Sequence, residues 1–273
     1  QSKLGWNREI LVPFCMKIQK GIFLYRVRSF NEKEERKRKQ MKITLKDGSS
    51  KEYAESMRVI DIAADISEGL ARMATAGEVN GEVVDLRTVV EEDCELSILT
   101  FQDEKGKGAF RHTASHIMAQ AIKRLYPDAK LAIGPSVADG FYYDIDRETP
   151  LTQEDLEKIE AEMKKIVKEA LPIEQFTKPR AEAIAYFQEK EEPYKVELIE
   201  DLPEDAVISF YSQGEFTDLC AGPHLMTTKP VKAFKLTSLA GAYWRGSEKN
   251  KMLQRIYGTA FPKKAELDEY LTM

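Results

Sequence analysis

MKITLKDG (residues 41–48) begins the part of the chain in which apolar and polar residues alternate as in a β-strand. The stretch ends in Asp47-Gly48, a dipeptide that favours the tight turn of a β-hairpin. SKEYA (50–54) follows and is expected to be the returning strand. The pattern therefore predicts an antiparallel hairpin at the start of a domain.

A helix and further strands are predicted after this hairpin. SMRVIDIAADISEGLARMA (56–74) carries apolar residues at mostly helical spacing, with Ser56 as the expected N-cap. Asn80-Gly81 is a second strong hairpin signal, and CELSILTF (94–101) predicts a closing strand. This order of elements predicts a small ubiquitin-like β-grasp unit, an α+β fold whose single helix covers one face of a sheet.

A second α+β unit is predicted beyond a linker. QDEKGKGAF (102–110) is rich in glycine and charge, as linkers often are, so domains are expected at residues 41–103 and 104–273. The expected helices are HTASHIMAQAIKRLY (112–126) and TQEDLEKIEAEMKKIVKEA (152–170), and the expected strands are GFYYDID (140–146), VISFYS (207–212) and KMLQRIYGTAF (251–261). One apolar stripe of the second helix is expected to lie across a sheet, and it consists of Leu156, Ile159, Met163, Ile166 and Val167.

Composition indicates a globular protein, since 42% of the 273 residues are hydrophobic and 32% are charged. No apolar run approaches the roughly 18 to 20 residues that span a bilayer, and no signal-peptide pattern is clear. Cys15, Cys94 and Cys220 are too few and too scattered for a disulfide framework, which fits a reducing compartment. We therefore expect a cytoplasmic protein without a membrane partner.

Charge is distributed unevenly along the chain. Residues 1–40 carry a net charge of +7 and residues 41–273 carry −12, which gives the overall −5. NEKEERKRKQ (31–40) has no apolar periodicity, so residues 1–40 are expected to be a basic extension that forms no domain, or alternatively an arm that contacts RNA phosphates. The acidic body argues against binding nucleic acid indiscriminately through bulk charge, and DNA is not an expected partner.

Two of the three histidines, His112 and His116, lie one helical turn apart in a predicted helix. At about 100° per residue His116 falls near 40° from His112, whereas the apolar residues of the helix cluster between roughly 140° and 280°. The histidines therefore point away from the core stripe, toward either solvent or a cleft.

The third histidine lies in CAGPH (220–224), four residues after Cys220. Gly222 and Pro223 between them suit a tight turn that aims both side chains inward. His112, His116, Cys220 and His224 would form a complete tetrahedral donor set for Zn²⁺. The same groups equally suit a hydrolytic site without metal, because imidazole titrates near neutral pH. Spacing alone does not choose between the two.

Six motifs in order resemble the amino-terminal half of bacterial threonyl-tRNA synthetases: RHTASHIMAQAI, AIGPSVADGFYYDID, PYKVELI, FTDLCAGPH, AGAYWRG and NKMLQRIYGTAF. The resemblance runs from Met41 to about Met273 and identifies the first unit with the TGS domain and the second with the editing domain. ELDEYLTM (266–273) ends where that family continues into a class II catalytic core. The resemblance thus implies a fragment of a longer ATP-dependent ligase, whose core would bind ATP and zinc and would form a homodimer.

In this family the editing domain hydrolyses seryl-tRNA(Thr). Serine lacks one methyl group of threonine, and one such group discriminates by only about 1 to 3 kcal/mol, so a second site is needed. The resemblance implies tRNA(Thr) and seryl-tRNA(Thr) as partners. It also implies six editing residues, namely His112, His116, Lys195, Asp218, Cys220 and His224.

The resemblance suggests a role for each of these residues. His112 and Lys195 are expected to position or polarise the water and the terminal ribose hydroxyls. Asp218 and Cys220 are expected to bind the seryl amine and hydroxyl, while the other two histidines, His116 and His224, shape the pocket.

Metal remains an open alternative, because the related alanyl-tRNA editing domain holds zinc with a similar set of residues. The resemblance implies that editing here requires no cofactor, with zinc at the His/Cys set as the alternative. Two further alternatives are a free-standing trans-editing deacylase and a zinc-held RNA-binding module without hydrolysis.

Basic and aromatic residues interleave near the carboxyl end, in AGAYWRG (240–246) and GSEKNKMLQRIYG (246–258). They would suit contact with the acceptor end of tRNA through phosphate neutralisation and base stacking. The alternative is that Trp244 and Tyr257 fill the core and the charges are solvated. The candidate residues are Tyr243, Trp244, Arg245, Lys249, Lys251, Arg255 and Tyr257.

Overall fold

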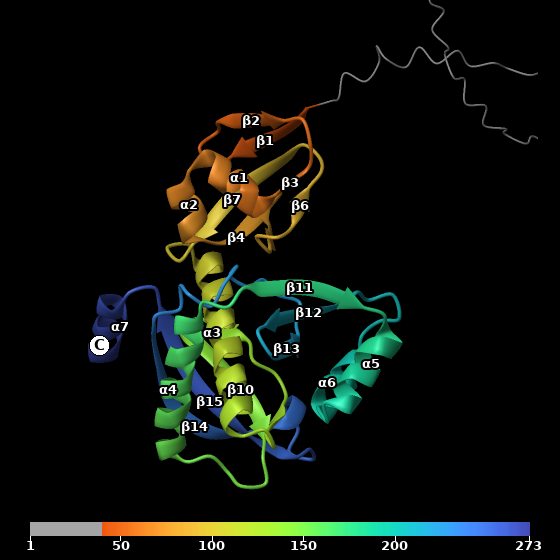
Figure 1. The fold of residues 1–273 in the computed structure, drawn as a ribbon, viewed down its shortest axis with the longest axis vertical. Helices are drawn as coiled ribbons and strands as arrows, with labels where there is room; N and C mark the ends of the chain where they lie inside the picture. Colours follow the sequence, from red (N-terminus) through yellow and green to blue (C-terminus); the bar gives the residue numbers. More distant parts are fainter. Residues whose placement is uncertain (1–39) are drawn as a thin grey trace, which may run out of the picture. The chain divides into compact units, whose positions relative to one another are not determined.

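The computed structural model describes residues 40–273 (Figure 1), and the expected basic extension, apart from Gln40, lies outside them. Within the described range, no helix is both long and apolar enough to cross a membrane. The first elements in chain order are β1 (Met41–Leu45), β2 (Ser50–Tyr53), β3 (Met57–Arg58), α1 (Val59–Ile66), α2 (Glu68–Met73), β4 (Ala74–Val79), β5 (Glu82–Val84), β6 (Val89–Val90) and β7 (Cys94–Thr100).

Five of these strands form a β-grasp sheet with the order β2-β1-β7-β4-β5. Strand β1 pairs antiparallel with β2 and parallel with β7, the last strand of the unit. Both predicted hairpins are confirmed. Asn80 and Gly81 have φ values of 50° and 88°, the left-handed conformation that a two-residue turn requires and that these residue types tolerate.

The predicted single helix from Ser56 is wrong in two respects. Residues Met57 and Arg58 instead pair with Val90 and Val89 as strands β3 and β6, and α1 begins only at Val59. Ser67 then interrupts the helical pattern, because its hydroxyl accepts hydrogen bonds from the backbone N–H groups that open α2.

The predicted linker is also wrong, because helix α3 (Glu104–Leu125) already begins within the glycine-rich stretch. Gly106 packs so tightly that a Cβ there would lie 2.0 Å from the Thr100 carbonyl oxygen. The glycine therefore permits a close approach to the end of β7 rather than chain flexibility. A domain boundary near residue 103 stays a prediction.

The remaining elements build a larger α+β unit. They are β8 (Lys130–Leu131), β9 (Ser136–Val137), β10 (Gly140–Asp146), α4 (Gln153–Glu169), β11 (Ile173–Lys178), α5 (Arg180–Glu189), α6 (Pro193–Glu200), β12 (Ile208–Gln213), β13 (Phe216–Leu219), β14 (Ala233–Tyr243), β15 (Met252–Phe261) and α7 (Lys264–Thr272). One sheet has the strand order β14-β15-β10-β8, with β9 also paired to β10, and a second sheet has the order β11-β12-β13. The helices and strands predicted from the sequence in this region are confirmed.

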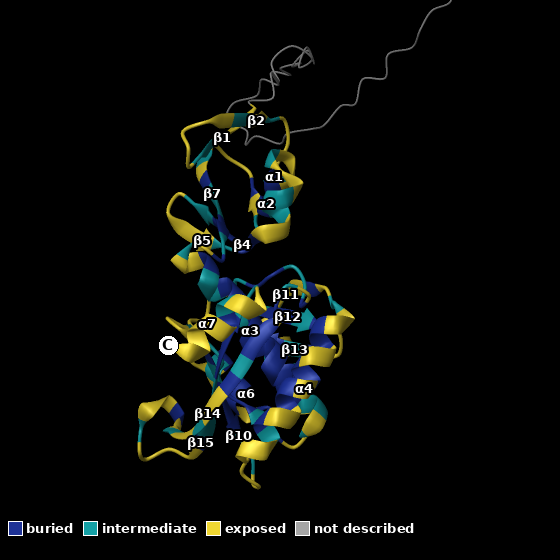
Figure 2. Ribbon diagram, turned by 90° about the vertical axis from the view of Figure 1, so that its left-hand side faces the viewer, coloured by how far each residue is buried: buried dark blue, intermediate teal, exposed yellow. Residues whose placement is uncertain are grey.

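Helices α3 and α4 pack side by side, and both contribute to the main hydrophobic core (Figures 1 and 2). The predicted apolar stripe of α4 is confirmed, since all five of its residues are buried in that core. The core face of α3 includes Ala114, Ile117, Met118, Ala121 and Ile122. This packing fixes the rotation of α3 and leaves another of its faces for the site described next.

Candidate active site

His112 and His116 lie outside the hydrophobic core cluster, as the helical spacing predicts. Their face of α3 is not a solvent face, however. His116 is only 3% exposed and His112 is half-buried, because the chain segment that follows β13 covers them. Of the two alternatives that the sequence left open, the structure excludes the solvent face, and the assignment of the histidines to a cleft stays a prediction.

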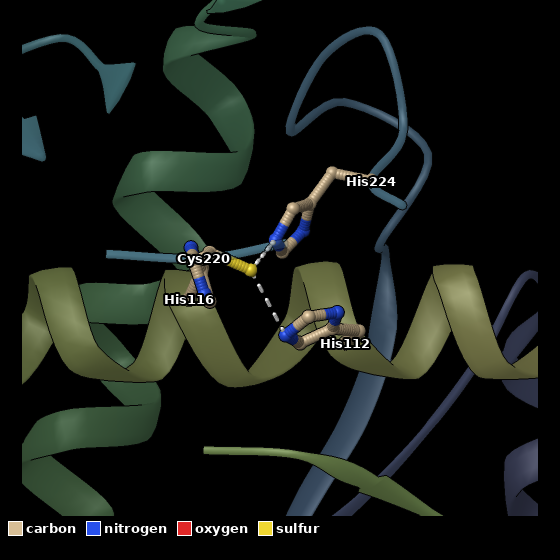
Figure 3. A group of neighbouring side chains, drawn as sticks. All are labelled: His112, His116, Cys220 and His224. Atoms are coloured by element: carbon tan, nitrogen blue, oxygen red, sulfur yellow. Dashed lines mark hydrogen bonds between the residues drawn. The ribbon is translucent and has the colours of Figure 1, made fainter. Parts of the chain in front are cut away.

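The segment from Cys220 to His224 brings a thiol and an imidazole onto this helix face (Figure 3). The Cys220 Sγ atom lies 3.2 Å from His224 Nε2 and 3.4 Å from His112 Nε2. Gly222 turns the chain with a φ of 76°, and a Cβ there would lie 2.1 Å from the Tyr211 hydroxyl oxygen. Only glycine therefore fits this turn, and the predicted tight turn is confirmed.

Hydrogen bonds fix the tautomer of His224. The Thr113 hydroxyl donates its one proton to the Ala109 carbonyl, so its oxygen accepts from the Leu225 N–H and from His224 Nδ1. His224 Nε2 then carries the lone pair and accepts the Cys220 thiol proton. This assignment agrees with the pKa shifts, because burial lowers the pKa of His224 well below its usual value and raises that of Cys220 to about 12.

The other two imidazoles are neutral near pH 7 as well. Burial lowers the pKa of His112 to about 4 and that of His116 to about 3, although the Asp218 carboxylate opposes the shift in both. Neutral imidazoles can accept a proton from water or coordinate a metal ion.

A buried ion pair borders these imidazoles. Lys195 of α6 and Asp218 of β13 are 3% and 2% exposed, and Lys195 Nζ lies 2.5 Å from Asp218 Oδ1. This contact leaves Oδ1 without a well-aligned hydrogen bond, so the oxygen can accept one from a bound group. Burial works against ionisation of Asp218, but the adjacent Lys195 ammonium and the hydrogen bond from the Tyr143 hydroxyl favour the charged form, and the pKa of the carboxyl is lowered.

Tyr143 of β10 joins the ion pair to the rest of the site. Its hydroxyl donates to Asp218 Oδ2 and accepts from Lys195 Nζ at 2.9 Å, while His116 Nε2 lies 3.6 Å from the same Oδ2. Tyr143 lies in the predicted strand GFYYDID but is not among the predicted site residues. Its inward-facing position in an alternating strand was the available signal.

The site opens toward a cleft of about 300 Å³ that Lys195 and Asp218 help to line. Its other lining residues come from α3, α5 and the segment around β13, and include Gln120, Lys123, Lys190, Phe216 and Thr217. A small polar group can therefore approach the buried ion pair.

The structure thus brings all six predicted editing residues into one neighbourhood. The ligand atoms of His112, His116, Cys220 and His224 lie within 4.8 Å of one another, and three imidazole nitrogens with one thiolate sulfur are a suitable donor set for Zn²⁺. The residues present therefore fit a zinc ion chemically, and they also satisfy one another through hydrogen bonds.

The basic and aromatic residues near the carboxyl end lie elsewhere. Trp244 is buried against Tyr194 and Leu253, and its indole N–H donates to Glu197, which favours the core alternative for this residue. Tyr243 is 42% exposed.

Three of the candidate basic side chains, those of Arg245, Lys251 and Arg255, are paired with carboxylates of the protein. Arg255 donates to Asp144 through two nitrogens, and Lys251 lies 2.7 Å from Asp146. Arg245 lies 2.6 Å from Asp201. RNA contact by this region stays a prediction.

Comparison with known families first gives the class of protein. Residues 41–100 match the TGS domain, and residues 208–257 match the domain described as "Threonyl and Alanyl tRNA synthetase second additional domain". The chain therefore combines a TGS domain with a second additional domain of aminoacyl-tRNA synthetases.

The chain is also similar to individual proteins that share one name. The chain is 66% identical over 232 residues to the threonine–tRNA ligase of Acetivibrio thermocellus and 63% identical over 231 residues to that of Clostridioides difficile, in each case over 85% of this chain. It is 60% identical over 235 residues, 86% of the chain, to the same enzyme of Caldanaerobacter subterraneus. The chain spans about 36% of the length of these relatives. Threonine–tRNA ligases are therefore homologues of this chain, and the resemblance seen in the sequence is confirmed.

Proposed function

We propose that this chain hydrolyses the aminoacyl ester of seryl-tRNA(Thr). The observation that carries the proposal is the convergence of His112, Cys220 and His224 beside the buried pair of Lys195 and Asp218. Neutral imidazoles, an ammonium and a carboxylate are the groups that activate water and bind an aminoacyl ester. The name of the relatives, threonine–tRNA ligase, supports tRNA(Thr) as the RNA that carries the ester. Serine as its amino acid is what the sequence resemblance implies.

Hydrolysis requires water to attack the ester carbonyl carbon, the carbon–oxygen bond to ribose to break, and the ribose oxygen to leave with a proton. His112 accepts the proton from the attacking water, because its imidazole is neutral and half-buried, whereas those of His116 and His224 are fully enclosed. The same imidazole can then return the proton to the leaving ribose oxygen.

Lys195 and Asp218 act on the substrate's charged and polar atoms. The Lys195 ammonium stabilises the negative charge that develops on the carbonyl oxygen, in a site where little water screens it. Asp218 Oδ1 has spare acceptor capacity and binds the seryl ammonium group. Tyr143 holds both side chains through its hydroxyl, so neither has to reorganise during the reaction.

Cys220 marks the end of the pocket for the seryl side chain. Its thiol proton is engaged by His224, and Gly222 N–H donates to the sulfur, so the group is fixed in place. A fixed wall of this kind can accept the serine hydroxymethyl group and clash with the additional methyl of threonine, which is the discrimination that a second site must supply.

If zinc binds, His112, His116, Cys220 and His224 would hold it, and it would supply a Lewis acid that lowers the pKa of a bound water. We propose that hydrolysis does not require it. Treating the chain with EDTA or 1,10-phenanthroline is expected to leave the rate of serine release unchanged, measured beside an untreated sample. Loss of activity that Zn²⁺ restores would contradict this expectation.

The hydrolysis itself is tested by incubating the chain with seryl-tRNA(Thr) and measuring free serine, together with elemental analysis of the protein. A second candidate, a zinc-held RNA-binding module, is favoured by the same His/Cys cluster. Stoichiometric zinc without serine release would support that module and overturn the proposed hydrolysis.

For the whole protein we propose the activity that the relatives' name describes, attachment of threonine to tRNA(Thr) with ATP. In this proposal, ATP, the threonine-binding zinc and homodimer formation belong to the part of those relatives that this chain does not match. A trans-editing deacylase consisting of this region alone would differ only in lacking that part.

A further inference from the structure

Asp85 and Arg87, in the segment between β5 and β6 of the TGS domain, reach the turn that carries His224. We propose that these two are positioning residues, which hold the Cys220–His224 turn in the geometry that hydrolysis needs. The proposal rests on the proposed function for its kinetic consequence. It makes the TGS domain a structural part of the active site.

Arg87 satisfies backbone carbonyls in two segments of the second unit. Its guanidinium donates to Leu225 O at 2.8 Å and to His224 O at 3.4 Å, in the turn itself, and to Ile173 O at 3.1 Å, at the start of β11. The side chain is largely buried, and Asp85 Oδ1 lies 2.8 Å from its Nη1. Because a buried carbonyl without a donor is costly, loss of Arg87 leaves the backbone around His224 unsupported.

Asp85 fixes the same turn from its other side. The carboxylate is only 7% exposed, and Oδ2 accepts hydrogen bonds from the His224 backbone N–H and the Tyr211 hydroxyl, each at 3.0 Å. The backbone of His224 is therefore held at its N–H by Asp85 and at its C=O by Arg87. Charge-assisted hydrogen bonds of this kind are stronger than neutral ones.

Tyr211 connects Asp85 to the imidazole of His224. Its ring centroid lies 4.5 Å from that of His224, and its hydroxyl occupies the space beside Gly222 that a Cβ would need. Fixing the Tyr211 hydroxyl through Asp85 thus fixes the ring against which the imidazole of His224 packs. That imidazole accepts the Cys220 thiol proton, so the contacts run without interruption from the TGS domain to the site.

Asp65 offers a matched control inside the TGS domain. Its carboxylate also accepts from a cation and a tyrosine, Lys51 Nζ at 2.8 Å and Tyr53 Oη at 2.9 Å. Both partners belong to the same domain, so Asp65→Ala removes a similar set of interactions without touching the His224 turn. Asp65 is 49% exposed, so this variant controls for loss of a paired carboxylate in the TGS domain, and the unfolding temperatures show how far each variant weakens the domain.

The test compares Asp85→Ala and Arg87→Met with Asp65→Ala and the unaltered chain in deacylation of seryl-tRNA(Thr). We expect kcat to fall about 10- to 100-fold in the first two variants, the range found for outer-shell groups that orient metal-ligating histidines, while their KM stays unchanged. The Asp65→Ala variant is expected to keep the kcat and KM of the unaltered chain. Thermal unfolding of each variant verifies that it folds. If Asp85→Ala does not fold, Asp85→Asn, which keeps the side-chain shape, replaces it.

A second readout does not depend on activity. Alkylation of Cys220 by iodoacetamide, mapped by mass spectrometry, is expected to become faster in Asp85→Ala, because the turn that buries the sulfur loses a hydrogen bond and the thiol becomes more accessible. Cys94 in the TGS domain serves as internal reference. Unchanged kcat together with unchanged protection of Cys220 would overturn the proposal. If the unaltered chain releases no serine, the proposed function fails, and the alkylation rates still decide whether Asp85 and Arg87 hold the turn.

Discussion

His112→Ala is expected to slow serine release from seryl-tRNA(Thr) by about 10²- to 10⁴-fold, the usual contribution of a general base. The imidazole is the half-buried member of the site and is the group assigned to accept the proton from water. Its face of α3 lies outside the hydrophobic core, so the fold is expected to remain intact. Single-turnover deacylation with saturating protein measures the effect.

The control for this variant is Lys107→Ala on the same helix, where the side chain pairs with Glu104 and no residue of the site is involved. Circular dichroism of both variants tests whether α3 is preserved. Loss of the folded state in His112→Ala would count against the cleft assignment, and activity equal to that of Lys107→Ala would count against the role of His112 as base.

Lys195→Met is expected to abolish hydrolysis and also to destabilise the fold by about 3 to 5 kcal/mol, because it leaves the Asp218 carboxylate buried without its cation. For a chain of this size that loss corresponds to a fall in Tm of roughly 6 to 20 °C, at about 2 to 4 °C per kcal/mol. Calorimetry and the deacylation assay measure the two effects on the same samples.

The double variant Lys195→Met/Asp218→Leu separates stability from catalysis. Replacing both members of a buried ion pair by apolar groups is often neutral or stabilising, so Tm is expected to recover while hydrolysis stays absent. Recovery of hydrolysis along with Tm would contradict the assignment of Lys195 and Asp218 to the reaction.

The sequence predicts which residues form the two parts of the site, His112 with His116 and Cys220 with His224, but it does not predict how deeply they are buried. Helical spacing correctly separates His112 and His116 from the core stripe, because that relation is local to one helix. It does not reveal that the segment from Cys220 to His224, about a hundred residues further on, covers this face. Burial of the imidazoles, and with it their lowered pKa values, therefore emerges only in the structure.

Errors in the fold prediction have the same origin. Glycine and charge around Gly106 are typical of a linker, but tertiary packing against Thr100 overrides that local signal. Pairing of Met57 and Arg58 with another strand likewise overrides the expected cap at Ser56. In both segments, contacts with distant residues decide the local structure. Local propensity does not include those contacts and therefore predicts the wrong element.

Residues that support the site were not predictable from spacing. Asp85 accepts from the backbone of His224, which is 139 residues away, and neither residue belongs to a motif that contains the other. Tyr143 similarly meets Lys195 and Asp218 only because β10, α6 and β13 converge. Such contacts depend on topology, which the pattern of one chain does not specify.

The central claim is that this site removes serine and spares threonine. The most direct test compares the rates at which the chain deacylates seryl-tRNA(Thr) and threonyl-tRNA(Thr) under single-turnover conditions. We predict hydrolysis of the seryl ester at a rate at least about tenfold higher, in line with what exclusion of one methyl group can provide. Equal rates for the two esters, or no hydrolysis of either, would contradict the account.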